Sequence, residues 1–428
     1  MTHRPNGTLG PDPAASDAAV SGGAVSEASM SGASMSGASV SGANRRRSWM
    51  ILGPTAASIA FVLELTLVPL LLPSLQRDFA VSLADLAWVF NAYGIAVACG
   101  VALSASFGDS FDLRKLVAIG IAFFAVGAAA VAMSTSFDML LAARALQGFG
   151  AGLFTPLLPI LLTQAAPKRP GRVLIVWGSI SGYIAAIAPY LHGQFFEQFG
   201  WPPAFALLAV LAALAGLALF LTPRLTTPAQ AASPLPPILE RAAQLLRSGG
   251  LWLMFLYVFC TYGAVTYYLF IVPVWFDQAG VDIAQMGFVL SLAWLSYASL
   301  STALRNVVDG PRLSAVMLSA PGLITLGLIF AYFCEDAYCQ VLSALFLGAG
   351  LACSNTPSTQ VILKLAPEGM RAVSTSLDIT FARLGGAVTV ALLARSGLSL
   401  ALVAVVTLAV VAVLSGALAL RAASTRPA

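Results

Sequence analysis

The sequence has very few charged residues. Asp, Glu, Lys and Arg together make up 9% of its 428 residues, whereas hydrophobic residues make up 59%. A soluble globular chain carries about 25% charged residues, so this composition excludes an ordinary soluble domain and indicates a membrane protein. The net charge of +4 is small, and because the basic residues follow a topological pattern rather than forming a patch, we expect no nucleic-acid partner.

Several chemical motifs are also missing. The sequence has no G-x-x-x-x-G-K-[ST] phosphate loop, no H-E-x-x-H and no G-x-S-x-G, and its only histidines are His3 and His192. These absences argue against an ATP-driven motor and against a membrane hydrolase. The five cysteines show no metal-ligand spacing, so we expect no metal and no cofactor. Cys334 and Cys339 flank a short polar loop, where a disulfide and two free thiols are both compatible with the sequence.

Long apolar runs are abundant. Between residues 49 and 420 we count twelve segments of about 20 residues, the length needed to cross a hydrocarbon core. The polar, proline-rich stretch 223–250 separates six of them from the other six. We therefore predict an all-α membrane protein with the following parts: a disordered low-complexity tail (1–47), a six-helix bundle (48–222), a cytoplasmic linker (223–250), a second six-helix bundle (251–421) and a short tail (422–428).

The basic residues support an even number of spans. If the N-terminus is cytoplasmic, 18 of the 22 Lys and Arg residues fall on the cytoplasmic side. Only Arg77 and Arg395 then lie outside, while Arg144 and Arg383 lie within spans. Because Lys and Arg are enriched on the cytoplasmic side of membrane proteins, we expect both termini to be cytoplasmic.

The fourth span, 140–164, combines Arg144 with Gly148, Gly150 and Gly152. An arginine in the middle of a membrane helix costs about 2.5–3.5 kcal/mol, so it is expected to face a protein interior or a wet cavity. Small residues allow close helix packing. The Gly-Ala-Gly-Leu sequence at 150–153 recurs at 348–351, an offset of 198. Ala166-Pro167 recurs as Ala366-Pro367 at an offset of 200, and 104–116 aligns with 301–313 at an offset of 197. Together these matches predict two parallel repeats with nearly one period, a known plan of secondary transporters.

Glu64 lies near the middle of the first span, and Arg144 is its natural partner. Burial favours the neutral acid and a nearby cation favours the charged form, so the two effects oppose each other. Such a group can carry a proton. The alternative is a static pair that pins two helices. Because intramembrane charges are functional by default, we favour proton coupling.

Other polar residues within spans predict a cavity between the bundles. The tenth span has the polar run 354–360, which would be unsatisfied against lipid. Asp378 and Arg383 are five residues apart and so do not share a helix face; a structural and a substrate role are both open for Asp378. Tyr262 is too deep for an interface anchor, and His192 fits either proton transfer or packing. The predicted substrate-binding residues are Asn91, Tyr93, Tyr262, Asn355, Gln360, Asp378 and Arg383.

The run Arg144-Ala-Leu-Gln147-Gly148-Phe-Gly150-Ala-Gly152, together with the segments 63–73, 76–78 and 88–93, resembles motifs of the major facilitator superfamily, in particular its drug/proton antiporters. The resemblance covers about residues 49–420. It implies the two-bundle fold, with Glu64 where the family usually has aspartate. It also implies gating roles for residues of the loop between the second and third spans and of the fourth- and fifth-span motifs, namely Asp109, Arg114, Lys115, Gln147, Gly148, Pro189 and Gly193.

These observations lead to a hypothesis of a multi-pass transporter in a bacterial inner membrane. It would export a small organic molecule in exchange for protons, work as a monomer, and use Glu64 and Arg144 for proton coupling. Its partners would be the substrate, protons and the lipid bilayer, and it would not be an enzyme. A proton-linked importer on the same scaffold is one alternative. A non-transporting receptor or assembly factor is the other, although a scaffold has no need of a mid-membrane acid.

Overall fold

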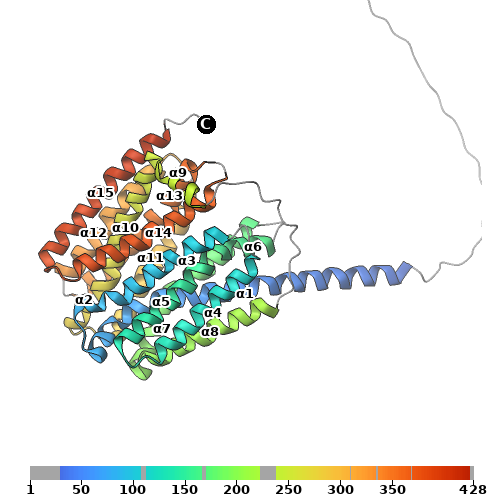
Figure 1. The fold of residues 1–428 in the computed structure, drawn as a ribbon, viewed down its shortest axis with the longest axis horizontal. Coiled ribbons are helices and arrows are strands. Elements are labelled where there is room, and N and C mark those ends of the chain that lie inside the picture. The colour runs from blue at the N-terminus through green and yellow to red at the C-terminus, as the bar shows by residue number, and fades with distance from the viewer. Residues whose placement is uncertain are drawn as a thin grey trace, which may run out of the picture. The chain divides into compact units, whose positions relative to one another are not determined.

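A computed structural model of the chain describes residues 29–107, 112–165, 170–221, 238–308, 310–333, 336–367 and 369–424. This part of the chain is almost entirely helical and has no β-strand (Figure 1). Twelve of its helical segments are long and apolar enough to cross a membrane. The all-α membrane fold with twelve spans, predicted from the apolar runs, is therefore confirmed.

The chain divides into Met1–Arg45 and a compact unit, Arg46–Ala428. The first six spans are α1 (Ser29–Phe79), α2 and α3 (Leu83–Leu86, Trp88–Phe107), α4 (Leu113–Ala132), α5, η1 and α6 (Phe137–Phe154, Thr155–Leu157, Leu158–Ala165), α7 (Pro170–Phe199) and α8 (Pro202–Leu221). The last six are α10 (Gly249–Gln278), α11 (Ile283–Val308), α12 (Leu313–Phe333), α13 (Ala337–Leu365), α14 (Arg371–Leu393) and α15 (Leu398–Ser424).

Two helices lie partly or wholly within the segments predicted as tail and linker, and the predicted division of the chain stays a prediction. Disorder is predicted up to residue 47, but α1 begins at Ser29. Extending an existing helix costs far less than nucleating one, and α1 has no proline before Pro54. A short helix, α9 (Ile238–Leu246), also lies inside the predicted linker. Its sequence alternates apolar and polar residues with helical spacing, and Leu245 packs in the same apolar cluster as Leu251.

The two sets of six spans repeat each other at an offset of 200 residues. Gly148 on α5 packs against the backbone of Tyr93 on α3, and Gly348 on α13 packs against that of Ala293 on α11. Two residues further, on the other side of the helix, Gly150 and Gly350 meet the equivalent pairs Gly120 and Phe124 on α4, and Ala320 and Ile324 on α12. The repeat predicted from sequence is therefore real, with the offset of 200 given by Ala166-Pro167 and Ala366-Pro367. The offset of 198 is wrong, because it pairs Gly150, which contacts α4, with Gly348, which contacts α11.

The glycines make this packing possible because no side chain separates the helices. A Cβ atom on Gly148 would lie 2.9 Å from Tyr93 Cα, and one on Gly348 would lie 2.9 Å from Tyr297 N. Both distances are too short for a real contact. Each set of six spans thus holds its central helix, α5 or α13, at backbone distance from its neighbours.

The two sets meet along two equivalent helix pairs, α3 with α14 and α7 with α11. At one end of the unit, Arg77 at the end of α1 donates to both carboxylate oxygens of Asp277 at the end of α10, each at 2.7 Å. These two residues are 200 apart and so occupy equivalent positions. We call this the Arg77 end. On the same side, the Tyr190 amide of α7 donates to Ser291 Oγ of α11 at 2.9 Å.

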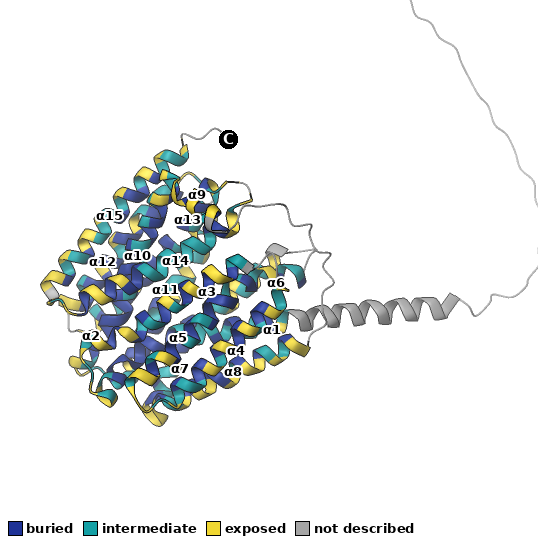
Figure 2. Ribbon diagram, in the orientation of Figure 1, coloured by how far each residue is buried: buried dark blue, intermediate teal, exposed yellow. Residues whose placement is uncertain are grey.

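Figure 2 shows the exposed faces of the helices. Many large apolar residues are exposed. Examples are Leu214 and Phe220 on α8 and Val403 and Leu414 on α15. In contrast, α1, α5 and α10 are buried over more of their lengths. An exposed surface of this kind is unfavourable in water and is satisfied by lipid. The helices that carry the deeply buried polar residues thus lie inside the unit.

The cysteines divide into two groups. Cys99, Cys260 and Cys353 are free, and the latter two are buried among apolar residues, as their positions in apolar segments predict. Cys339 is disulfide-bonded. Cys334 lies outside the described residues.

The turn after α1 provides a stability test. Ala80 has φ of +49°, and the equivalent residue after α10 is Gly280, with φ of +79°. A left-handed backbone costs a non-glycine residue about 1–2 kcal/mol. We therefore expect Ala80→Gly to raise the free energy of unfolding by about 1 kcal/mol after the larger backbone entropy of glycine is subtracted. Thermal unfolding of the purified protein in detergent measures this.

The matched control is Ala122→Gly, on an exposed face of the right-handed helix α4. This change should lower stability by about 0.5–1 kcal/mol, because a glycine inside a helix is unfavourable. If both substitutions destabilise the protein equally, then the left-handed turn at Ala80 is not strained.

Candidate functional site

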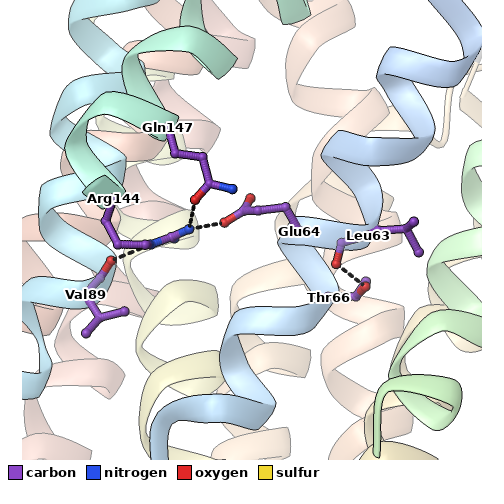
Figure 3. A network of polar contacts seen from close by, with 6 residues as sticks. All are labelled: Leu63, Glu64, Thr66, Val89, Arg144 and Gln147. Carbon is purple, nitrogen blue, oxygen red and sulfur yellow. Dashed lines mark hydrogen bonds and ion pairs between the residues drawn. The ribbon is translucent and has the colours of Figure 1, made fainter. Parts of the chain in front are cut away.

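A buried ion pair joins the first and fourth spans. Arg144 Nη1 of α5 lies 2.6 Å from Glu64 Oε1 of α1, and the two side chains point toward one another (Figure 3). Glu64 is 1% exposed and Arg144 2% exposed. Glu64 lies near the middle of its span, Ile51–Phe79. The acid and base that the sequence predicts to be partners are thus in contact, away from water.

Arg144 has further partners that fix its orientation. Its Nη1 also donates to Gln147 Oε1 at 2.7 Å, and its Nε donates to the Val89 carbonyl at 3.4 Å (Figure 3). Its Cζ lies 4.2 Å from the centre of the Tyr93 ring, a cation–π contact. Arginine can engage all of these groups at once because its guanidinium is planar and carries five N–H donors.

Three polar atoms around this pair are left without a hydrogen-bond partner. Among the described residues they are Glu64 Oε2, Gln147 Nε2 and the Tyr93 hydroxyl, and each is buried; Asn91 Oδ1 of α3 is buried without a partner as well. An unsatisfied buried polar atom costs about 1–3 kcal/mol, so such atoms rarely gather without a purpose. The free oxygen of Glu64 is a position at which a proton can bind.

A second polar cluster lies in the last six spans. Thr359 Oγ1 of α13 donates to Asp378 Oδ2 of α14 at 3.0 Å, and Asn355 Nδ2 of α13 donates to the Tyr297 hydroxyl of α11 at 2.7 Å. Asn355 thus faces protein rather than lipid, as the cavity argument requires. Tyr262 of α10 interacts electrostatically with both Asp378 and Tyr297. Gln360, one residue after Thr359, is half-buried.

Arg383 lies between the two clusters. It is on α14, and its carbonyl oxygen packs at Gly94 of α3, where a Cβ would lie 3.7 Å away. Its side chain interacts electrostatically with Tyr93, which belongs to the first cluster, and with Tyr262, which belongs to the second. Tyr93, Arg383, Tyr262 and Asp378 are therefore linked by electrostatic interactions across the contact between α3 and α14.

The predicted gating residues fall in three places. Gln147 and Gly148 belong to the central network of α5. Pro189 and Gly193 of α7 pack on the start of α11, where a Cβ on Gly193 would lie 3.0 Å from Ala284 Cα. Arg114 of α4 donates to the carbonyls of Leu219 and Phe220 at the end of α8. Lys115 is exposed, and Asp109 lies outside the described residues.

His192 packs rather than joining either cluster. Its ring stacks on Phe196 with centroids 6.0 Å apart, and it interacts with the backbone of Thr66 on α1.

Sequence reasoning missed two residue pairs. The first pair is Asn355 with Tyr297. Nothing in the sequence singles out Tyr297, because it is one of several aromatic residues in an apolar span. Arg77 and Asp277 could have been paired from the 200-residue offset, since equivalent residues near a two-fold axis face each other.

The chain resembles known bacterial export proteins. It is 28% identical to the tetracenomycin C resistance and export protein of Streptomyces glaucescens over 67% of this chain and 51% of that protein. It is 33% identical to the puromycin resistance protein pur8 of Streptomyces alboniger over 42% of this chain and 36% of that protein. The matched stretches thus span about half or less of these relatives.

Solved structures share its fold. The nucleoside transporter NupG has a TM-score of 0.69 with 16% identity, over 89% of this chain and all of that one. A bacterial homologue of the lysosomal transporter Spinster has a TM-score of 0.63 with 14% identity, over 89% of this chain and 97% of that one.

The model of the Major Facilitator Superfamily matches residues 23–390 of this chain. This match covers most of both six-helix sets, and the homologues are transporters rather than enzymes. The chain belongs to the Major Facilitator Superfamily.

Proposed function

We propose that this protein is a proton-coupled secondary transporter that exports a small organic molecule by alternating access. Glu64 carries the proton, and Arg144 holds its charged form in place. The observation that carries the proposal is the ion pair itself, 2.6 Å long and almost fully buried. Removing two charges from water is so costly that such a pair is weak evidence for stability. A functional reason for keeping it is therefore needed.

The internal repeat supports a functional rather than a structural reason. Adding 200 to Glu64 and Arg144 leads to Ala264 on α10 and Ala344 on α13. Both alanines are buried, 3% and 0% exposed. The last six spans thus form the equivalent fold with two methyl groups where the first six have an acid and a base. The fold does not need a charged pair at this position, which argues against the interpretation of a static pin.

Alternating access explains how a buried acid can exchange protons. In this state Glu64 has almost no exposure, so the proton must enter or leave in a different arrangement of the helices. Protonation makes the Glu64 carboxyl neutral. The ion pair is then lost, and the Arg144 guanidinium is free to take another partner. This changes the relative free energies of the two arrangements, and only such a differential effect can couple a proton to transport.

The two polar clusters provide the substrate site of the proposal. Its residues are Asn91 and Tyr93 from α3, Tyr262 from α10, Asn355 and Gln360 from α13, and Asp378 and Arg383 from α14. They come from both sets of spans, so a rocking motion would expose them to each side in turn. Arg77 and Asp277 close the Arg77 end, and the packing of Pro189 and Gly193 on α11 stabilises the same contact between the two sets.

Export is favoured over import by the relatives, whose names record resistance or export of tetracenomycin C and resistance to puromycin. Because the relatives are bacterial, we place the protein in a bacterial inner membrane. The distribution of basic residues places both termini in the cytoplasm. We take a monomer as the working unit. A proton-linked importer on the same scaffold is the alternative, and the direction of proton movement distinguishes the two. A receptor or assembly factor would move neither proton nor substrate.

Replacing Glu64 with Gln tests the coupling. The protein is reconstituted into liposomes that contain a pH-sensitive dye, and a gradient of puromycin or tetracenomycin C is imposed. We expect the unmodified protein to move protons against the direction of the compound. Glu64→Gln should reduce proton movement to the level of protein-free liposomes, because the amide cannot be protonated. Exchange of labelled compound across the membrane without a pH gradient should continue.

The matched control is Asp138→Asn, which changes an exposed carboxylate at the start of α5 and should leave both fluxes unchanged. Proton movement that persists in Glu64→Gln would show that another group carries the proton. Movement of protons with the compound, rather than against it, would favour the importer. Loss of both fluxes together with a large loss of thermal stability would favour the static pin.

Reversing the Arg77–Asp277 pair tests the gate. In Arg77→Asp two carboxylates face each other, which destabilises the closed Arg77 end. We expect slower transport in the liposome assay, and recovery in the double variant Arg77→Asp with Asp277→Arg, where the pair forms with its charges exchanged. Because the pair is partly exposed, with 60% and 33% of the side chains accessible, its contribution is about 1 kcal/mol or less. Failure of the double variant to recover would remove the ion pair from the gating mechanism.

A further inference from the structure

Within the described part of the chain, Asp378 and Arg383, the two charged residues inside the α14 span, have no ion-pair partner. Ion pairs are formed by Arg77 with Asp277 and by Arg144 with Glu64, and neither pair includes Asp378 or Arg383. In the part of the chain that the structure describes, no carboxylate lies within ion-pair distance of Arg383. Asp378 has only the Thr359 hydroxyl as a side-chain donor there. Both residues lie within the span Arg371–Leu393, and Arg383 lies near its middle.

An unpaired charge at this depth is costly, by about 2.5–3.5 kcal/mol for arginine even on the most lenient scales. Arg383 cannot reach a membrane surface from mid-span, and both residues are only partly buried. Arg144, the other central cation, is already occupied by Glu64, Gln147 and Val89. The structure thus contains one acid and one base with open positions for partners.

The spacing of these two charges is defined by the helix. Five residues correspond to about 7.5 Å along the axis of an α-helix and about 140° around it, so the two side chains leave α14 in different directions. Tyr262 of the neighbouring helix α10 interacts electrostatically with both Asp378 and Arg383. Tyr93 of α3 interacts with Arg383 as well. Tyr262 is therefore an aromatic residue that the two charges have in common.

We propose, building on the transport function proposed above, that singly charged and neutral compounds bind this site more weakly and that its preferred substrate is an aromatic zwitterion. Its cationic group pairs with Asp378, its anionic group pairs with Arg383, and its ring packs against Tyr262. A zwitterion satisfies both open charges at once, whereas a simple cation or a simple anion leaves one buried charge unpaired. The cost of an unpaired charge in a site of this kind supplies the selectivity.

The probe is 4-(aminomethyl)benzoate, a rigid aromatic zwitterion whose charged groups lie at opposite ends of one ring. Benzylamine and 4-methylbenzoate each keep one of the two charges. Binding to the purified protein is measured from the rise in thermal unfolding temperature with concentration. We expect the zwitterion to bind about tenfold more tightly, or better, than either analogue, because each charge-assisted hydrogen bond is worth about 1.5–3 kcal/mol.

Two variants give opposite expected patterns. Asp378→Asn should abolish the advantage of the zwitterion over 4-methylbenzoate but keep its advantage over benzylamine. Arg383→Gln should do the reverse. A merely structural role for these residues would change the affinity for all three compounds together. Asp138→Asn and Arg312→Gln, which change exposed charges, are the controls and should leave all affinities as they are.

Equal binding of the three compounds, or no binding of the zwitterion at millimolar concentration, would overturn the proposal. So would a preference that survives both variants. The result is separate from proton coupling, because the assay imposes no pH gradient and Glu64→Gln should keep the preference for the zwitterion. Proton movement that persists in Glu64→Gln would contradict the function proposed for Glu64, while the binding pattern of the α14 variants would stand.

Discussion

An ion pair without access to water is favourable only when its geometry is fixed, and the first six spans are built around this requirement. Gly148 brings α5 against the backbone of α3, which places Arg144 over the Tyr93 ring and beside the Val89 carbonyl. Glu64 then meets the guanidinium from α1 at 2.6 Å. A longer separation between these helices would leave two unpaired charges in an apolar interior. The close helix packing and the buried charges therefore depend on each other.

The offset of 200 residues separates what the fold needs from what the function adds. Equivalent glycines pack equivalent helices in both halves, and Ala80 and Gly280 form equivalent left-handed turns. The charged residues do not follow this symmetry, because Glu64 and Arg144 correspond to Ala264 and Ala344. Likewise Asp378 and Arg383 correspond to Gly178 and Tyr183 on α7. A symmetric scaffold with asymmetric charges is what a transporter needs if its two halves are to have different tasks.

Much of this could be predicted from the sequence. Apolar length identifies twelve spans, and the cost of an intramembrane charge identifies Glu64 and Arg144 as partners. The register of the repeat could not be settled from the sequence, because the match of Gly-Ala-Gly-Leu at an offset of 198 competes with that of Ala-Pro at the true offset of 200, in which Gly148 corresponds to Gly348. The contact of Asn355 with Tyr297 was also out of reach, since it depends on which faces of α13 and α11 meet. Sequence spacing describes one helix at a time and not the rotation between two.

The arrangement of the rings suggests how the proton and the substrate could influence each other. Tyr93 contacts Arg144 and lies within electrostatic reach of Arg383, so one side chain borders both the proton site and the proposed substrate site. A zwitterion adds no net charge, and direct charge repulsion between proton and substrate would therefore be weak. Coupling would then have to act through the position of α3, whose Gly94 packs against the backbone of Arg383. Movement of α3 away from α14 would separate Tyr93 from Arg383 and loosen the contacts of Arg144 in one step. On this view, helix packing rather than charge competition links the two sites.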